Sequence, residues 1–264
     1  MTEIRLVTID LDGTLLDSRQ QVSARNLAAL QRLLDARVIV ALATARDRAS
    51  IAGRVPLVMP GLYYIASGGA MVYQPAEDAI SWAEMLPPAL AAEAVAFLRR
   101  FDEPVFVNAD CDYWVDRDDD RVAMIERRYD LRTRPFDRVE DLPAVMRASL
   151  AAPRLVLERA AREAIVAFGD RASVSLASPD WLDVLGPGAG KGPALAWLQA
   201  QAGVSRDQTL AIGDYDSDLP LFAAAGYRVA MANGVAAIQA ASTHRTASND
   251  EDGVATALEM FFPA

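Results

Sequence analysis

Cysteine and histidine are almost absent from this sequence of 264 residues, which contains one of each, Cys111 and His244. A single cysteine cannot form a disulfide within the chain, which is consistent with a reducing compartment. A single histidine makes a Ser-His-Asp triad, a multi-histidine zinc site or a histidine phosphorelay a poor explanation of any activity.

The sequence also lacks an excess of positive charge and any long apolar segment. Lysine and arginine total 26 against 36 aspartates and glutamates, so the formal net charge is -10 and no positive field attracts nucleic-acid phosphates. No apolar run is long enough to cross a bilayer, and no basic segment with an apolar signal core opens the chain. We therefore expect a cytoplasmic protein with no nucleic-acid or membrane partner. We also expect a monomer or weak homodimer.

The most informative stretch is the one that opens the chain. The mostly apolar run 4–9 is typical of a buried parallel strand and is followed by Asp10, Asp12 and Gly13. Ligands of open α/β sheets lie beyond the carboxyl ends of the strands, and two nearby carboxylates repel each other unless a cation or a proton intervenes. The stretch indicates a metal site or covalent acid chemistry, although its residues alone also fit an ordinary Asp-Gly turn.

The first and last thirds of the chain alternate strand and helix patterns, which is typical of a doubly wound, mostly parallel α/β sheet. Strands are predicted over residues 4–9, 38–43, 62–66, 209–212 and 227–231 and near 245–246, and helices over 23–37, 47–54, 191–202, 219–225 and 235–241 and at the C-terminal end.

The middle of the chain has a different order of predicted helices and strands. Helices are predicted over 87–101, 119–129, 142–146 and 160–168, and strands over 105–108, 113–115, 154–157, 173–176 and 181–185. Helices that alternate with strand pairs favour an inserted α+β domain with an antiparallel sheet. We therefore predict a core domain over 1–83 and 187–264 and an inserted domain over 84–186, with the Gly-rich stretch 186–190 as a hinge.

Four polar signals stand at element ends of the predicted core. They are the pair Asp10 and Asp12, Thr44, Lys191, and the pair Asp214 and Asp218. Each signal alone also has an ordinary structural explanation. Thr and Asp at strand ends often cap helices or form turns, and a Lys at a helix start is usually solvated. Together they supply a nucleophile, a proton shuttle, phosphate donors and carboxylates for Mg2+, which are the needs of phosphoryl transfer.

In this combination the residues resemble the haloacid dehalogenase (HAD) superfamily of phosphatases, and in particular its Cof-type branch with a type IIB cap. The resemblance rests on Asp10-Leu11-Asp12-Gly13-Thr14, Thr44, Gly190-Lys191-Gly192, Gly213-Asp214-x-x-x-Asp218 and the closing stretch 249–254. It implies a HAD-like core and a cap formed by the insert. It also implies a small phosphate ester as substrate, with sugar phosphates as the usual class.

The resemblance implies a role for each matched residue. Asp10 would attack phosphorus and form an aspartyl-phosphate, while Asp12 would protonate the leaving alcohol and later activate water. Lys191 would neutralise charge on Asp10 and on the phosphoryl group. Mg2+ would be held by Asp10, Asp214 and the main-chain carbonyl of Asp12, with Asp218 supporting it directly or through water.

Phosphate and substrate contacts form a second implied group. The phosphate oxygens would bind Thr44 and backbone N-H groups near Gly13 and Ala45. Arg46 is a candidate for holding an anionic substrate, with an ion pair to an acid as its alternative. Asn249 is a candidate pocket residue, with a cap for the final helix as its alternative.

Some positions depart from the family pattern, and two other functions remain open. Ala45, Gly68 and Ser217 stand where the family commonly has Gly, Asn and Asn. These departures bear on rate and substrate choice more than on reaction type. The alternatives are a phosphomutase of the phosphomannomutase type, which shares core and cap, and a non-catalytic sensor of a phosphometabolite.

Overall fold

The structure is a computed structural model that describes residues 3–54, 57–109, 111–129 and 131–263. Its contacts divide the chain into two compact units. The first unit comprises Met1–Arg46, Ser50–Ala83 and Lys191–Ala264, and the second comprises Asp47–Ala49 and Glu84–Gly190. Each unit contains its own sheet, so the chain is a mixed α/β protein, as predicted.

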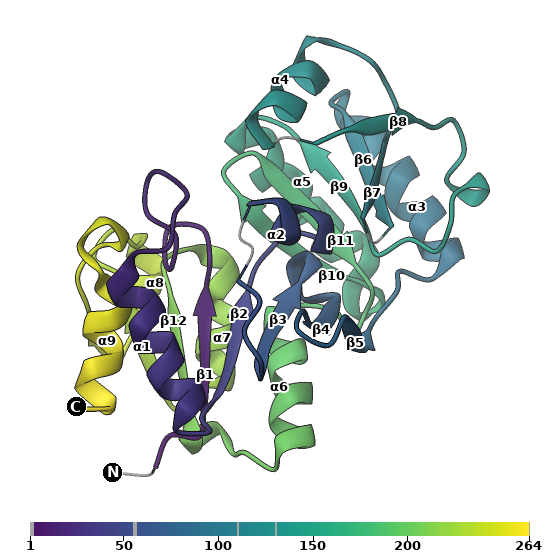
Figure 1. Ribbon diagram of the computed structural model, residues 1–264. Helices are drawn as coiled ribbons and strands as arrows, with labels where there is room; N and C mark the ends of the chain where they lie inside the picture. The colour runs from purple at the N-terminus through teal and green to yellow at the C-terminus, as the bar shows by residue number, and fades with distance from the viewer. Residues whose placement is uncertain (1–2, 55–56, 110, 130, 264) are drawn as a thin grey trace. The chain divides into compact units, whose positions relative to one another are not determined.

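The first unit is built on an eight-stranded sheet in the order β14-β13-β12-β1-β2-β3-β4-β5 (Figure 1). Its strands are β1 (Leu6–Asp10), β2 (Ile39–Ala43), β3 (Leu62–Ala66), β4 (Met71–Gln74), β5 (Ala79–Ala83), β12 (Thr209–Gly213), β13 (Tyr227–Ala230) and β14 (His244–Arg245). The strands from β14 to β3 are parallel, which confirms the mostly parallel sheet. The antiparallel strands β4 and β5 were not predicted.

Helices cover both faces of this sheet. The helices around it are α1 (Ala24–Asp35), α6 (Lys191–Ala202), α7 (Leu219–Ala224), α8 (Ala236–Ala241) and α9 (Gly253–Phe261). Helix α2 (Arg48–Arg54) follows β2 along the chain. Helices α1 and α9 lie side by side on one face, and α6 and α7 lie on the other (Figure 1). Alternate strand residues such as Leu6 and Ile65 share a buried cluster with Leu195 and Phe222 of these helices.

The second unit is a six-stranded sheet in the order β10-β11-β9-β6-β7-β8. Its elements are α3 (Pro88–Leu98), β6 (Val105–Ala109), β7 (Asp112–Val115), α4 (Asp120–Tyr129), β8 (Thr133–Pro135), β9 (Arg147–Ala151), α5 (Arg154–Phe168), β10 (Ser173–Ser178) and β11 (Trp181–Leu185). All pairs are antiparallel except β7 with β8. Val105 and Val107 share a core with α3 and α5, whereas Phe106 points to the opposite face and packs with α4.

Two sequence predictions in this unit are wrong. Arg154–Leu157 is not a strand but the first turn of α5, and the neighbouring strand β9 lies earlier. Pro153 precedes the helix, and its buried residues recur at helical spacing, because a proline suits a helix start and the Leu-Val-Leu run belongs to an amphipathic face. The predicted helix over 142–146 is likewise absent, and a short 3-10 turn over Val139–Asp141 precedes β9.

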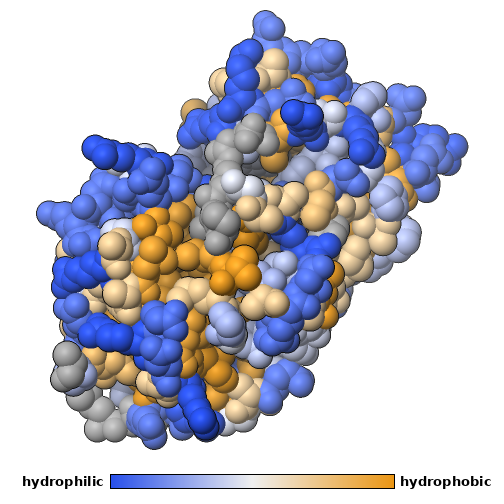
Figure 2. All heavy atoms as spheres, viewed as in Figure 1, coloured by the Kyte–Doolittle hydropathy of each residue, from blue (hydrophilic) through white to orange (hydrophobic). Residues whose placement is uncertain are grey.

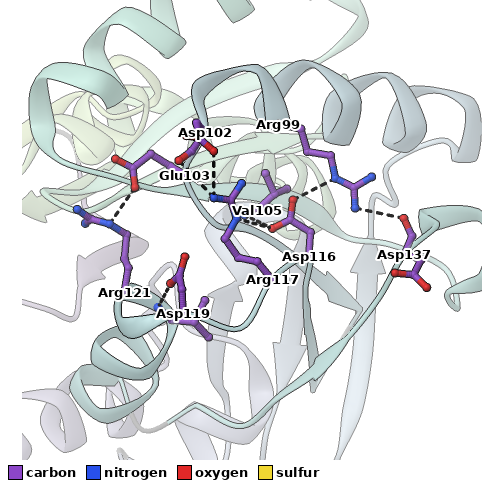
Figure 3. Close-up of polar contacts among 10 residues, drawn as sticks. Arg99, Asp102, Glu103, Val105, Asp116, Arg117, Asp119, Arg121 and Asp137 are labelled. Carbon is purple, nitrogen blue, oxygen red and sulfur yellow. Dashed lines mark hydrogen bonds and ion pairs between the residues drawn. The ribbon is translucent and has the colours of Figure 1, made fainter.

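A network of ion pairs joins the end of α3 to the sheet of the second unit (Figure 3). The carboxylate of Asp116, which follows β7, accepts hydrogen bonds from Arg99 Nε and from the backbone N-H of Val105, both at 3.0 Å. Arg117 Nε lies 3.5 Å from the same carboxylate. Because the Asp116 side chain is buried, these charge-assisted contacts offset its loss of water.

A second polar group is buried in the sheet itself. Arg147 Nη1 donates to Asp183 Oδ2 at 3.0 Å, and Arg147 Nη2 donates to the hydroxyl of Tyr113 at 2.8 Å. The other Asp183 oxygen accepts from Ser149 at 2.6 Å. Both side chains of the ion pair are almost fully buried, and Asp183 contributes more than any other acid to keeping Arg147 charged.

Asp183→Ala should destabilise the protein by about 3 to 5 kcal/mol, because it removes the main counter-charge of the buried Arg147 guanidinium. The matched control is Glu93→Ala, which removes the exposed ion pair to Arg171 and should cost less than about 1 kcal/mol. Urea unfolding of both variants measures the difference. Equal losses would contradict the assignment of Asp183 as the counter-charge that Arg147 requires.

The described part of the chain contains no helix with the length and apolar composition of a membrane span. Figure 2 shows hydrophilic side chains over much of both units on the viewed face, with hydrophobic ones gathered mainly over the first unit.

Candidate active site

The polar residues singled out in the sequence lie together at the carboxyl ends of the central strands of the first sheet. The strands β12, β1 and β2 are neighbours and run parallel, so their carboxyl ends lie together (Figure 1). Asp10 is the last residue of β1, Thr44 directly follows β2, and Asp214 directly follows β12. Lys191 is the first residue of α6. The topology therefore places four chemically active side chains at the ligand-binding end of a doubly wound sheet.

The centre of the site is the ammonium group of Lys191. Its Nζ lies 2.6 Å from Asp10 Oδ1 and 2.6 Å from Asp218 Oδ1. All three side chains are buried, with exposed fractions of 7% or less. Burial by itself would lower the pKa of Lys191, but the two carboxylates outweigh that effect and raise it. Lys191 is therefore charged and is held between two acids.

The carboxylates outnumber this single positive charge. Burial, together with the charges of Asp218 and Asp214, raises the pKa of Asp10 well above its ordinary value, and Lys191 only partly opposes this effect. Burial and the charge of Asp218 likewise raise the pKa of Asp214 to about 7. Three buried acids around one ammonium make a cluster that favours a further cation or a proton.

Asp218 is the structural member of this cluster. Its Oδ2 accepts the backbone N-H groups of Asp214 and Tyr215, each at 3.1 Å, while its Oδ1 contacts Lys191. The side chain is fully buried. Asp218 thus holds the loop after β12 and the Lys191 side chain in one arrangement.

The turn after β1 packs directly against Asp214. Thr14 Oγ1 donates to Asp214 Oδ1 at 2.9 Å. Gly13 has a φ of +85°, and a Cβ added there would lie 2.5 Å from Asp214 Oδ2. Only glycine combines this left-handed backbone with so close an approach to the carboxylate. Gly13 and Thr14 are therefore both required by the close packing of this turn against Asp214.

Asp12 is bound by Arg46 through both of its carboxylate oxygens. Arg46 Nε donates to Oδ2 at 2.9 Å, and Arg46 Nη2 donates to Oδ1 at 2.6 Å. Nη2 also donates to the side-chain carbonyl of Gln20. The backbone N-H of Arg46 donates to Thr44 Oγ1 at 3.1 Å, so the Thr44 hydroxyl keeps its own proton for an acceptor. Of the alternatives for Arg46, the structure shows the ion pair to an acid.

Asn249 supports the turn after β1 from the C-terminal part of the chain. Its side-chain amide donates to the Leu16 carbonyl at 2.9 Å, and its backbone N-H donates to Asn233 Oδ1 at 3.1 Å. Asn233 Nδ2 in turn donates to the Gly13 carbonyl at 2.8 Å. The alternative role of Asn249 as the cap of the final helix is wrong, because Asp252 occupies that position.

Gln20 and Asn233 contact the site residues and were not identified from the sequence. Neither belongs to a recognisable motif, since Asn233 reads as an ordinary Asn-Gly turn and Gln20 lies in a polar loop. Gln20 has a φ of +62°, a left-handed conformation that is uncommon outside glycine and that only coordinates reveal.

The family departures have visible local effects. Ser217 Oγ lies 3.5 Å from Lys191 Nζ, at the outer limit of a hydrogen bond, so the shorter side chain still reaches the site. Gly68 has a φ of +69°, a backbone conformation that glycine adopts without strain. Ala45 lies between Thr44 and Arg46 on the turn after β2.

The acidic cluster fits a hard divalent cation. Asp10, Asp214 and Asp218 each offer a carboxylate oxygen, and these oxygens lie within 4.8 Å of one another. Carboxylate oxygens are the ligands that Mg2+ prefers. Because both oxygens of Asp218 already accept hydrogen bonds, Asp10 and Asp214 are the better placed pair for direct binding.

A doubly wound sheet with an Asp-x-Asp turn, a buried lysine and an acidic loop at its carboxyl edge defines a hydrolase of the phosphoryl-transfer type. Residues 7–258 match the haloacid dehalogenase-like hydrolase family, and the chain belongs to this family. The resemblance drawn from the motifs is thereby confirmed.

The chain is also similar to curated proteins and to solved structures. It is 28% identical to the 5-amino-6-(5-phospho-D-ribitylamino)uracil phosphatase YwtE of Bacillus subtilis, over 97% of this chain and 98% of that protein. It is 28% identical to the chloroplastic endoribonuclease YBEY of Arabidopsis thaliana, over 96% of this chain but 45% of that protein. A haloacid dehalogenase-like hydrolase of Bacteroides thetaiotaomicron superposes with a TM-score of 0.81 at 25% identity, covering 98% of this chain and all of the other.

Gly13→Ala should disturb the Asp214 carboxylate and weaken Mg2+ binding at least about 10-fold, because the added Cβ meets Oδ2. Gly61→Ala is the matched control, since Gly61 has a similar φ of +81° but its nearest atom is Leu34 Cδ2 at 3.8 Å. Both variants should lose about 1 to 2 kcal/mol of stability from backbone strain. Calorimetric titration measures the Mg2+ affinity of both variants. Equal affinities would refute the role of the close contact between Gly13 and Asp214.

In EDTA the free energy of unfolding should fall as the pH rises from about 5 to 8. Asp214 binds its proton more tightly in the folded protein, with a pKa of about 7, than in the unfolded chain, where the ordinary value is 3.8. The resulting stabilisation is fully present below the unfolded value and is lost as the pH rises through about 7. The expected fall is on the order of 2 to 4 kcal/mol.

Urea unfolding between pH 5 and pH 8 measures this dependence. Asp214→Asn should show a smaller fall, because it removes the titrating group. Excess Mg2+ should reduce the fall in the wild type, since a bound cation favours the ionised carboxylate. An identical pH dependence for wild type and Asp214→Asn would rule out Asp214 as its source.

Proposed function

We propose that this protein is a Mg2+-dependent phosphatase that hydrolyses small phosphomonoesters through an aspartyl-phosphate on Asp10. Sugar phosphates or related metabolites are the proposed substrate class. The similarity to a phosphatase of a ribityl phosphate in Bacillus subtilis supports a small phosphorylated metabolite.

The buried Lys191 between Asp10 and Asp218 is the observation that carries this proposal. A structural salt bridge needs one acid for each base, yet this cluster also includes the largely buried Asp214. An excess of buried negative charge is unfavourable unless a ligand compensates for it. The position of this acidic cluster at the carboxyl ends of the strands supports a catalytic role.

The chain's own residues account for each proton and bond of the proposed reaction. A carboxylate oxygen of Asp10 attacks phosphorus while the ester P-O bond breaks, and Asp12 gives a proton to the departing oxygen. Asp12, now a carboxylate, takes a proton from water, whose oxygen attacks phosphorus and releases phosphate from Asp10. Lys191 and the Thr44 hydroxyl bind negative charge on the phosphoryl group throughout.

Mg2+ held by Asp10, Asp214 and the main-chain carbonyl of Asp12 would neutralise charge on the phosphoryl oxygens. In this proposal Asp218 supports the metal site and Lys191. Backbone groups around Gly13 and Ala45 bind phosphate oxygens, and Asn249 supports the turn they belong to.

The second unit is proposed to act as the cap that selects the leaving group and excludes water. Its assignment as a type IIB cap rests on the family and on its α+β architecture. The predicted location in the cytoplasm and the monomeric or weakly dimeric state remain predictions.

Asp10→Asn should abolish phosphate release while leaving the fold intact. Loss of a covalent nucleophile costs orders of magnitude in rate, about 10⁴-fold or more. The variant should still fold and unfold cooperatively, because Lys191 keeps its ion pair with Asp218. The assay follows phosphate release from a panel of sugar phosphates and an aryl phosphate, with Mg2+ or EDTA.

The outcomes distinguish the proposal from its alternatives. Equal rates for Asp10→Asn and wild type would exclude the covalent role of Asp10. Isomerisation of a hexose phosphate without phosphate release would identify a phosphomutase, and binding without turnover would identify a sensor. Activity that persists in EDTA would exclude the requirement for Mg2+.

A further inference from the structure

Two nitrogens of the Arg46 guanidinium form a fork that binds the two carboxylate oxygens of Asp12, and within the described residues Asp10, Asp214 and Asp218 make no such two-point contact with an arginine. Arg46 Nε and Nη2 lie 2.9 Å and 2.6 Å from the two oxygens of Asp12. We propose that Arg46, itself held by Gln20, is a positioning residue that orients the Asp12 carboxyl toward the leaving oxygen of the substrate. This inference rests on the proposed phosphatase function.

The geometry favours positioning over an incidental surface ion pair. A bidentate guanidinium pair fixes both the position and the plane of the carboxyl group, which a single contact does not. The Asp12 side chain is 46% exposed and would otherwise have rotamer freedom, whereas the Arg46 side chain is only 14% exposed. The better ordered partner is therefore the arginine.

Arg46 is in turn fixed at both of its ends. Its backbone N-H donates to the hydroxyl of Thr44, directly after β2. Its guanidinium donates to the side-chain carbonyl of Gln20, whose backbone has the left-handed φ of +62°. A non-glycine residue in this conformation is uncommon and is retained where the surroundings demand it. Two loops of the first unit thus converge on one guanidinium.

The same contacts argue against phosphate binding as the main role of Arg46. Two of its donor nitrogens, Nε and Nη2, are directed at Asp12. A phosphate would have to displace Asp12 to use the fork, and the displaced acid is the one proposed to donate the proton. Arg46 therefore acts on the substrate through Asp12.

The proposed step makes a distinctive kinetic prediction. As the bond from Asp10 to phosphorus forms and the ester P-O bond breaks, the Asp12 proton passes to the ester oxygen. An alkoxide or phenolate of high basicity needs this proton to leave, whereas 2,4-dinitrophenolate leaves without it. A residue that positions the acid thus affects poor leaving groups selectively, because general acid catalysis acts only on them.

The test compares kcat/KM for phenyl phosphate and 2,4-dinitrophenyl phosphate in the full-length protein with Mg2+. This parameter reports the steps up to departure of the leaving group and is independent of later hydrolysis of the intermediate. Arg46→Lys keeps the charge but loses the fork, and should lower the ratio of the phenyl to the dinitrophenyl value about 10²-fold.

Gln20→Asn tests the support of Arg46 without altering Arg46 itself. Asparagine tolerates the left-handed backbone but lacks one methylene, so it withdraws the carbonyl from Nη2. The same ratio should fall about 10-fold, as expected for a misplaced catalytic group. The matched control is Gln21→Asn at the exposed neighbouring residue, which should leave the ratio and the unfolding temperature unchanged.

The outcomes separate this inference from the function on which it rests. If wild type hydrolyses neither ester, or Asp10→Asn hydrolyses them as fast, the proposed function fails and this inference falls with it. If hydrolysis requires Asp10 but Arg46→Lys and Gln20→Asn lower kcat/KM for both esters by the same factor, the proposed function stands and the positioning role is wrong. A rise in the ratio of the phenyl to the dinitrophenyl kcat/KM would also overturn the positioning role, because Arg46 would then hinder proton donation by Asp12.

Discussion

The pairing of the Lys191 ammonium with the carboxylates of Asp10 and Asp218 is the interaction on which the site depends. All three groups are buried, so none has water to replace a lost partner. Asp218 extends the pairing through its second oxygen to the backbone of the loop after β12. The first residue of α6 and the carboxyl ends of β1 and β12 are thereby held together by charge.

A second set of contacts controls the turn that follows β1. Residues far along the chain hold its carbonyl groups, with Asn233 on Gly13 and Asn249 on Leu16. Thr14 and Gly13 lie against Asp214, so the turn, the acidic loop and the C-terminal segment form one assembly. This arrangement explains why a short Asp-Gly-Thr sequence can act as a rigid part of a site, since a free turn of that composition would move.

The insert shows where periodicity misleads. A run of three apolar residues after Arg154 is compatible with a strand, but the buried positions continue at helical spacing for three more turns. The strands β4, β5, β8 and β9 were not predicted. Both β4 and β8 are short, and the pairing partners of all four strands, rather than their own sequences, stabilise them. In contrast, the limits of β3, β11 and α6 agree with the prediction, because turn residues or a helix start bound each of them clearly.

The sequence by itself determined the parallel sheet, the family and the grouping of Asp10, Thr44 and Asp214, because neighbouring parallel strands bring their carboxyl ends together. Lys191 was added to this group by the family motif. The tertiary structure alone decided that Arg46 forms a two-point ion pair with Asp12. It also revealed Gln20 and Asn233, which no motif marks. The physical reason is that side-chain hydrogen bonds between remote loops depend on backbone conformations, such as the left-handed Gln20, that sequence patterns do not specify.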